Sequence, residues 1–79
     1  MKFEVRLFGG LEKSVTGATF GKPIDVEAPE GTTVAGVISM IGVREEEVFT
    51  ILVNGVRAEI ETLVRQGDRV AFFPPVGGG

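Results

Sequence analysis

The groups best placed to do chemistry gather at the C-terminal end of the chain. Three glycines, Gly77–Gly79, follow a stiff apolar stem, Phe72–Val76. Glycine loses the most backbone entropy on ordering and buries no side chain, so this run does not help a fold. A frayed terminus without function explains the glycines equally well if they are taken alone. Because Pro74 and Pro75 keep the stem extended, it could also thread the glycines into a narrow channel, with the Gly79 carboxylate as the reactive group.

The composition limits what else the chain could do. Its 79 residues include no Cys and no His, and its formal net charge is −3. The usual thiol nucleophiles, zinc ligands and neutral-pH general base are therefore absent. Mild acidity also argues against a nucleic-acid binder, whose affinity comes from clustered Lys and Arg. We therefore expect a carrier or binding module with no catalytic site, bound cofactor or metal of its own.

The sequence gives no sign of a membrane partner. No apolar run approaches the roughly 20 residues that a spanning helix needs. Residues 1–6 alternate apolar and charged side chains, unlike the apolar core of a signal peptide. We expect a soluble, cytoplasmic protein.

The elements that would position the tail follow from periodicity. Alternation over 2–8 and 24–28 predicts two strands, separated by a loop at 9–21 that has room for one helical turn at 11–15. A helix is predicted over 33–41, with Thr32 or Thr33 as its N-cap and Gly42 at its end. Its apolar stripe has the i, i+3, i+4, i+7 spacing and consists of Val34, Val37, Ile38 and Ile41.

The pattern of apolar residues in the second half of the chain predicts further strands. An apolar run at 49–53 leads into Asn54-Gly55, the strongest short hairpin signal, and a return strand begins at Val56. Leu63 is expected to anchor the following loop in the core, and 69–73 forms the last strand. One helix laid across a mixed sheet of four or five strands is the economical arrangement. We expect the first and last strands to be adjacent and parallel.

Three apolar residues fall out of phase with the core positions of their strands: Phe8, Leu52 and Phe73. If those strands are neighbours, the three side chains form one patch on the outer face of the sheet, and a contiguous apolar patch marks an interface. A different register would bury some of them beneath the 9–21 loop. Both arrangements stay open at this point.

The run Val70–Gly79 resembles the end of the MoaD/ThiS family of sulfur carriers. The Gly67-Asp68 turn, the helix start at 33–35 and the hairpin at 52–55 belong to the same pattern, so the resemblance covers essentially the whole chain. Phe-Phe-Pro-Pro-Val before the glycines and the long 9–21 loop look like the molybdopterin branch. The family usually ends in two glycines, which correspond to Gly78 and Gly79, whereas Gly77 adds a third.

The resemblance implies an α+β, ubiquitin-like β-grasp domain over residues 1–73 and a flexible tail over 74–79. It implies that an ATP-dependent, ubiquitin-activating-like adenylyltransferase adenylates the Gly79 carboxylate, and that a sulfur donor protein converts it to a thiocarboxylate. The larger molybdopterin synthase subunit would then take the sulfur. ATP belongs to the activating partner, and no cofactor is bound here. The partner-binding residues would be Phe73, Pro74, Pro75, Val76 and Gly77, together with Phe8 and Leu52.

Three alternatives remain open on the sequence. The chain could carry sulfur for thiamine thiazole synthesis. It could be a ubiquitin-like protein tag that is joined to lysines through the same glycine. It could also be an accessory domain whose tail does no chemistry.

Overall fold

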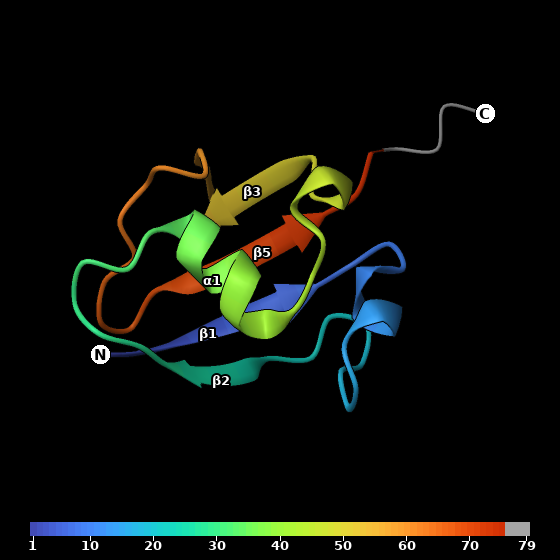
Figure 1. The fold of residues 1–79 in the computed structure, drawn as a ribbon, viewed down its shortest axis with the longest axis horizontal. Helices are drawn as coiled ribbons and strands as arrows, with labels where there is room; N and C mark the ends of the chain where they lie inside the picture. Colours follow the sequence, from blue (N-terminus) through green and yellow to red (C-terminus); the bar gives the residue numbers. More distant parts are fainter. Residues whose placement is uncertain (76–79) are drawn as a thin grey trace.

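The computed structural model describes residues 1–75, and Figure 1 shows their arrangement. Among these residues, no helix has the length and apolar character needed to cross a membrane. The elements are, in chain order, β1 (Lys2–Leu7), the 3-10 helix η1 (Leu11–Ser14), β2 (Ile24–Glu27), α1 (Val34–Ile41), the 3-10 helix η2 (Glu45–Glu47), β3 (Thr50–Val53), β4 (Val56–Arg57) and β5 (Arg69–Phe73).

The strands form one five-stranded mixed sheet in the order β2-β1-β5-β3-β4. β1 and β5 lie side by side at its centre and run parallel, with Val5 opposite Val70 and Leu7 opposite Phe72. The other pairs are antiparallel. The predicted mixed sheet, and the predicted parallel pairing of the first and last strands, are confirmed.

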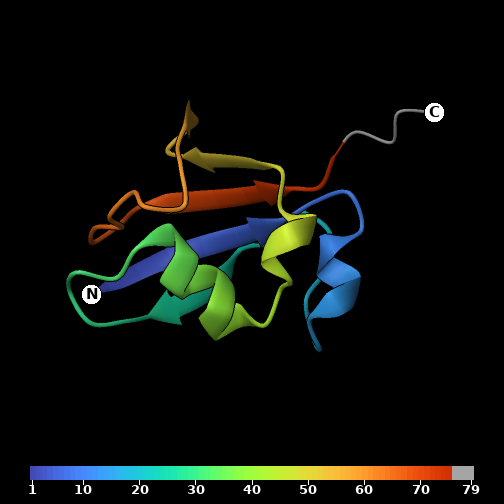
Figure 2. The ribbon, with the colours of Figure 1, turned by 45° about the horizontal axis from the view of Figure 1, so that its top comes forward.

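The core lies between the sheet and α1, which crosses one face of the sheet (Figure 2). Successive strand residues point to opposite faces, so every second side chain enters this layer. Phe72 is the largest fully buried side chain, and Val34, Val37 and Ile38 contribute to the same core from α1. The helix is short, so this packing rather than its own propensity holds it in place.

Both ends of α1 are closed as expected. The Thr33 hydroxyl accepts a hydrogen bond from the Gly36 N–H at 3.2 Å. Gly42 has φ 95° and its N–H returns to the Ile38 carbonyl, which is the usual left-handed end of a helix. The first N–H groups of the helix bond to the carbonyls of Thr62 and Ile60, so the loop before β5 completes the helix start.

Two details differ from the predicted core. Leu63 is 52% exposed, and the loop is anchored by Val64 instead, which is 3% exposed. The reason is an antiparallel bridge between Thr33 and Leu63, beside which the Val64 N–H donates to the Thr32 carbonyl. Successive residues in an extended segment point to opposite sides, so only one of Leu63 and Val64 can face the core. Ile41, the last residue of α1, is only half-buried and packs at the border of the core.

Candidate tail-exit and docking site

The tail leaves the body where β1, β5 and the 9–21 loop meet, at one end of the sheet (Figure 1). Here the Phe8 N–H donates to the Phe72 carbonyl at 3.2 Å, which extends the β1–β5 pairing by one residue. On the other side, the Phe49 N–H donates to the Phe73 carbonyl at 2.8 Å. Hydrogen bonds on both sides thus hold the chain up to Phe73. Pro74 and Pro75, which have no backbone N–H to donate, then interrupt the ladder.

Three aromatic rings lie together at this exit, and we call Phe8, Phe20 and Phe73 the aromatic cluster. Phe8 and Phe73 are stacked, with ring centroids 4.7 Å apart and planes 6° from parallel. Phe20, from the 9–21 loop, meets Phe8 edge-on at 5.4 Å and 89°. Each such contact stabilises the fold by about 0.5–1.5 kcal/mol beyond the free energy gained from burying the rings. Phe20 remains 61% exposed, so the cluster presents apolar surface to solvent.

The aromatic cluster lies on the sheet face opposite α1. Phe73 follows the buried Phe72, and Leu52 faces Ala71 across the β3–β5 pair, one position from the buried Ile51. Phe8, Leu52 and Phe73 are therefore on one face of three adjacent strands, and each is half-buried. The second arrangement that the sequence left open also holds in part, because Phe20 of the 9–21 loop packs on Phe8.

Pro74 makes an unusually close contact with the body. Gly9 has φ +67°, and a Cβ built there would lie 2.6 Å from both Cδ and Cγ of the Pro74 ring. A carbon atom cannot approach that closely, so only glycine fits under this proline as it stands. Pro74 is half-buried by its surroundings, whereas Pro75 is exposed.

A shallow cleft of about 320 Å³ borders Pro74 and Pro75, between η1 and η2. Glu46 lies on its rim. Hydrogen bonding from the backbone at Glu46 itself, and then from the Arg44 side chain 3.1 Å away, lowers the pKa of this carboxyl from its ordinary value. The shift favours the charged form of the carboxyl, which gives the cleft beside the stem an acidic edge.

The rest of the predicted site lies outside the described residues: Val76, Gly77, Gly78 and Gly79. Their predicted roles stay predictions. Within residues 1–75, the structure brings Phe8, Phe73 and Pro74 together and places Leu52 one strand away on the same face. Phe20 and Gly9 were missed by the sequence reasoning, although the glycine pair directly after the first strand was a signal that could have been weighed.

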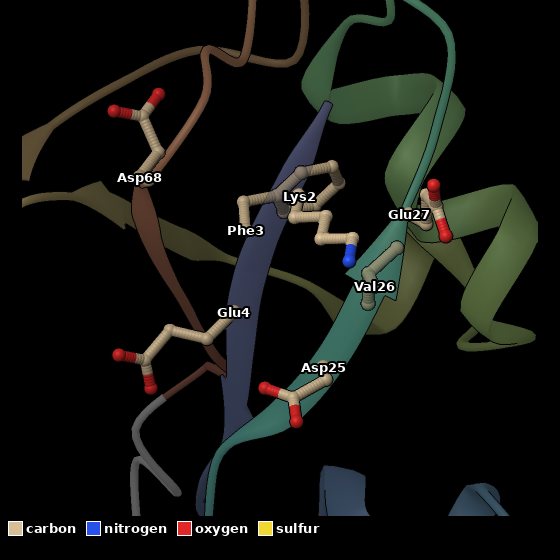
Figure 3. A pocket seen from close by; sticks show the side chains of 8 residues that line it. Lys2, Phe3, Glu4, Asp25, Val26, Glu27 and Asp68 are labelled. Atoms are coloured by element: carbon tan, nitrogen blue, oxygen red, sulfur yellow. The ribbon is translucent and has the colours of Figure 1, made fainter.

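A second hollow, on the far part of the open face, has a different character (Figure 3). Four carboxylates surround it, from Glu4, Asp25, Glu27 and Asp68, but Figure 3 shows them pointing apart rather than toward one centre. Two already have protein partners. Glu4 pairs with Arg6 at 3.1 Å, and Asp68 accepts from the Asn54 amide and the Arg65 N–H. Among residues 1–75, no three acidic or other ligating side chains gather as a metal site requires.

The helix over a five-stranded mixed sheet, with parallel terminal strands at its centre, defines a ubiquitin-like β-grasp protein. The sequence model of the ThiS family matches residues 5–79, and the chain belongs to this family of ubiquitin-like sulfur carriers. No curated protein sequence matches it.

Solved structures agree on the fold. The putative molybdopterin converting factor subunit 1 of Pyrococcus furiosus is 27% identical with a TM-score of 0.72, over 96% of this chain and 99% of that one. SAMP1 of Haloferax volcanii is 22% identical with a TM-score of 0.72, over 100% of both chains. A Helicobacter pylori structure, a complex of subunits 1 and 2 of molybdopterin-converting factor, matches at 22% identity and a TM-score of 0.64, over 100% of both chains.

Proposed function

We propose that this chain is a sulfur carrier in molybdopterin biosynthesis, with the Gly79 carboxylate as the site that is loaded. The observation that carries the proposal is the family match, which runs through the glycines to residue 79. Similarity to the Pyrococcus furiosus protein, described as a putative molybdopterin converting factor subunit, favours the pterin pathway. The β5 strand and Pro74 lead directly into the residues that would do the chemistry.

The chemistry requires activation because a carboxylate is a poor electrophile. An ATP-dependent adenylyltransferase would join the Gly79 carboxylate to the α-phosphate of ATP and release pyrophosphate. A sulfide equivalent from a donor protein would then add to the carbonyl carbon, forming the C–S bond as the C–O bond to AMP breaks. The product is a thiocarboxylate and AMP. The chain contains neither Cys nor His, and no step here needs either on the carrier.

Docking onto partners would use the aromatic cluster and Leu52. Threading three glycines into a channel costs about 1–2 kcal/mol of backbone entropy per residue. They have no side chains to bury in return, so apolar surface nearby must offset the loss, at about 25 cal/mol per Å² buried. The half-buried and exposed rings beside the exit provide such apolar surface next to the start of the tail. The complex of the Helicobacter pylori subunits supports a larger synthase subunit as one such partner.

Intact mass spectrometry tests the proposal. After incubation with the activating enzyme, ATP and a sulfur donor, the chain should gain the mass difference between sulfur and oxygen. It should then pass that sulfur to the pterin precursor on the larger synthase subunit. Gly79→Ala should abolish loading or transfer and weaken binding to the larger subunit only slightly. Loss of binding with transfer intact would contradict the proposal.

Other outcomes of the same experiment would replace it. Transfer only to a thiazole-forming enzyme would assign the thiamine pathway. An isopeptide bond between Gly79 and lysines of other proteins would make the chain a protein tag. Activity that survives deletion of Gly78 and Gly79 would leave no role for the tail. Deleting Gly77 alone asks whether the length from stem to tip matters, since a partner that reads only the last two glycines should tolerate it.

A further inference from the structure

We propose that Gly9 is a positioning residue for the tail. Its missing side chain lets Pro74 seat against the end of β1, and this contact sets the direction in which the chain leaves the sheet. The inference rests on the proposed function, because direction matters only if the tip must reach a reactive centre.

The contact leaves no room for adjustment at Gly9. A Cβ at this position would meet two ring atoms of Pro74 at 2.6 Å, well inside the separation that carbon atoms tolerate. The φ of +67° is one that glycine adopts freely and other residues adopt only with strain. A side chain here would therefore force either the loop or Pro74 to move.

Pro74 is joined to a residue that is fixed on two sides. The Phe73 carbonyl accepts from the Phe49 N–H at 2.8 Å, and the Phe73 ring stacks on Phe8 with centroids 4.7 Å apart. Phe73 can yield little, so a displaced Pro74 would swing the chain that follows it. Pro74 has no N–H with which a neighbouring strand could hold it. Its contact with Gly9 is consequently a restraint on the direction in which the chain continues beyond β5.

The direction of the tail affects the reaction rate, because the Gly79 carboxylate must react inside another protein. A reacting carbon held about 1 Å from its productive position costs about a hundredfold in rate. A shift at Pro74 moves the point from which the chain continues toward Gly79. Binding through the open sheet face is set by other residues and should be less affected.

A double-mutant cycle tests the contact. Gly9→Ala introduces the clash, and Pro74→Ala removes the two ring atoms that it would strike. Gly17→Ala is the matched control, because Gly17 lies in the same loop at φ +84° and has nothing within 4 Å of a built Cβ, so it reports strain without a clash. The rate of thiocarboxylate formation with the activating enzyme, and affinity for the larger synthase subunit, are measured for each variant.

We expect Gly9→Ala to slow loading about tenfold to a hundredfold relative to Gly17→Ala, with affinity nearly unchanged. In the Pro74→Ala background, adding Gly9→Ala should cost no more than Gly17→Ala does, which is the signature of a direct contact. Nuclear Overhauser effects between the Gly9 α-protons and the Pro74 ring should be present in the wild type. These effects give a readout that does not depend on activity.

The outcomes separate the two proposals. If the wild type loads sulfur and Gly9→Ala behaves as Gly17→Ala does, the positioning role is wrong and the carrier function stands. If the wild type never loads sulfur, the carrier function fails and the positioning role fails with it. If Gly9→Ala does not fold, recovery of a folded protein by adding Pro74→Ala supports the contact. A Pro74→Ala variant that loads at the wild-type rate contradicts its role.

Discussion

The two faces of the sheet share the same strands but differ in burial and in the side chains that they carry. Phe72 and Phe73 are adjacent in β5, yet Phe72 is fully buried against α1, whereas Phe73 stacks on Phe8 on the open face. The face under α1 contains the buried core, and the open face carries charges at one end and the aromatic cluster at the other. If the open face binds partners as proposed, substitutions at two adjacent residues should alter stability and docking separately. The following changes test that separation.

The largest expected effect comes from Phe72→Ala. Phe72 has 0% exposure, so the substitution removes buried apolar surface and leaves a cavity in the centre of the sheet. The free energy of unfolding should fall by about 3–5 kcal/mol. Urea denaturation with an unchanged m-value measures it, and a loss below about 1 kcal/mol would show that Phe72 is not the centre of the core.

A somewhat smaller loss is expected from Ile38→Ala in α1, which is 2% exposed. The free energy of unfolding should fall by about 2–4 kcal/mol through lost burial and the remaining cavity. Met40→Ala, at a position on the same helix that is 52% exposed, is the matched control and should change stability far less. Equal losses at the two positions would mean that α1 does not pack as described.

Phe73→Ala tests the open face. Affinity for the larger synthase subunit should fall by about 1–3 kcal/mol, as it does when an interface loses a buried aromatic anchor. The unfolding free energy should fall less than for Phe72→Ala, because the ring is only half-buried. Isothermal titration calorimetry measures the affinity. Val56→Ala, an exposed position on the edge strand β4, is the control and should bind normally. Unchanged affinity in Phe73→Ala would remove the docking role from the aromatic cluster.

The smallest effect is expected at the charged end of the open face. Glu4 and Arg6 pair at 3.1 Å with side chains 24% and 44% exposed. Such partly solvated pairs contribute about 0–1 kcal/mol, so Glu4→Gln should change the unfolding free energy within that range. Thermal or urea denaturation at low and high salt checks this. A fall in unfolding free energy as large as that of Ile38→Ala would mean that the open face also contributes strongly to stability.

Much of the fold could be predicted from the sequence because periodicity reports which side chains share a face. The stripe through Val34, Val37 and Ile38 was sufficient to place α1 on the sheet, and alternation in β1 and β5 placed Phe8 and Phe73 together once the strands were paired. Leu63 and Val64 could not be told apart, since the choice depends on the bridge to Thr33 rather than on a local pattern.

The candidate site was less accessible to such reasoning. Phe20 lies in a loop without periodicity, so nothing in the sequence says that its ring turns back onto Phe8. The requirement for glycine at position 9 was also invisible in the sequence, because it arises from Pro74 at the other end of the chain. Contacts between remote segments become visible only when the sheet has brought them together.

The parallel pairing of β1 and β5 also has a mechanical consequence. The start of β1 and the end of β5 lie at opposite ends of the sheet, as Figure 1 shows. A pull on the tail against the N-terminus therefore runs along both strands and loads their hydrogen bonds in shear. Bonds loaded this way must break together, whereas an edge strand such as β4 could be peeled away one bond at a time. A partner that pulls on the tail would thus load the β1–β5 pair in the direction in which its hydrogen bonds resist best.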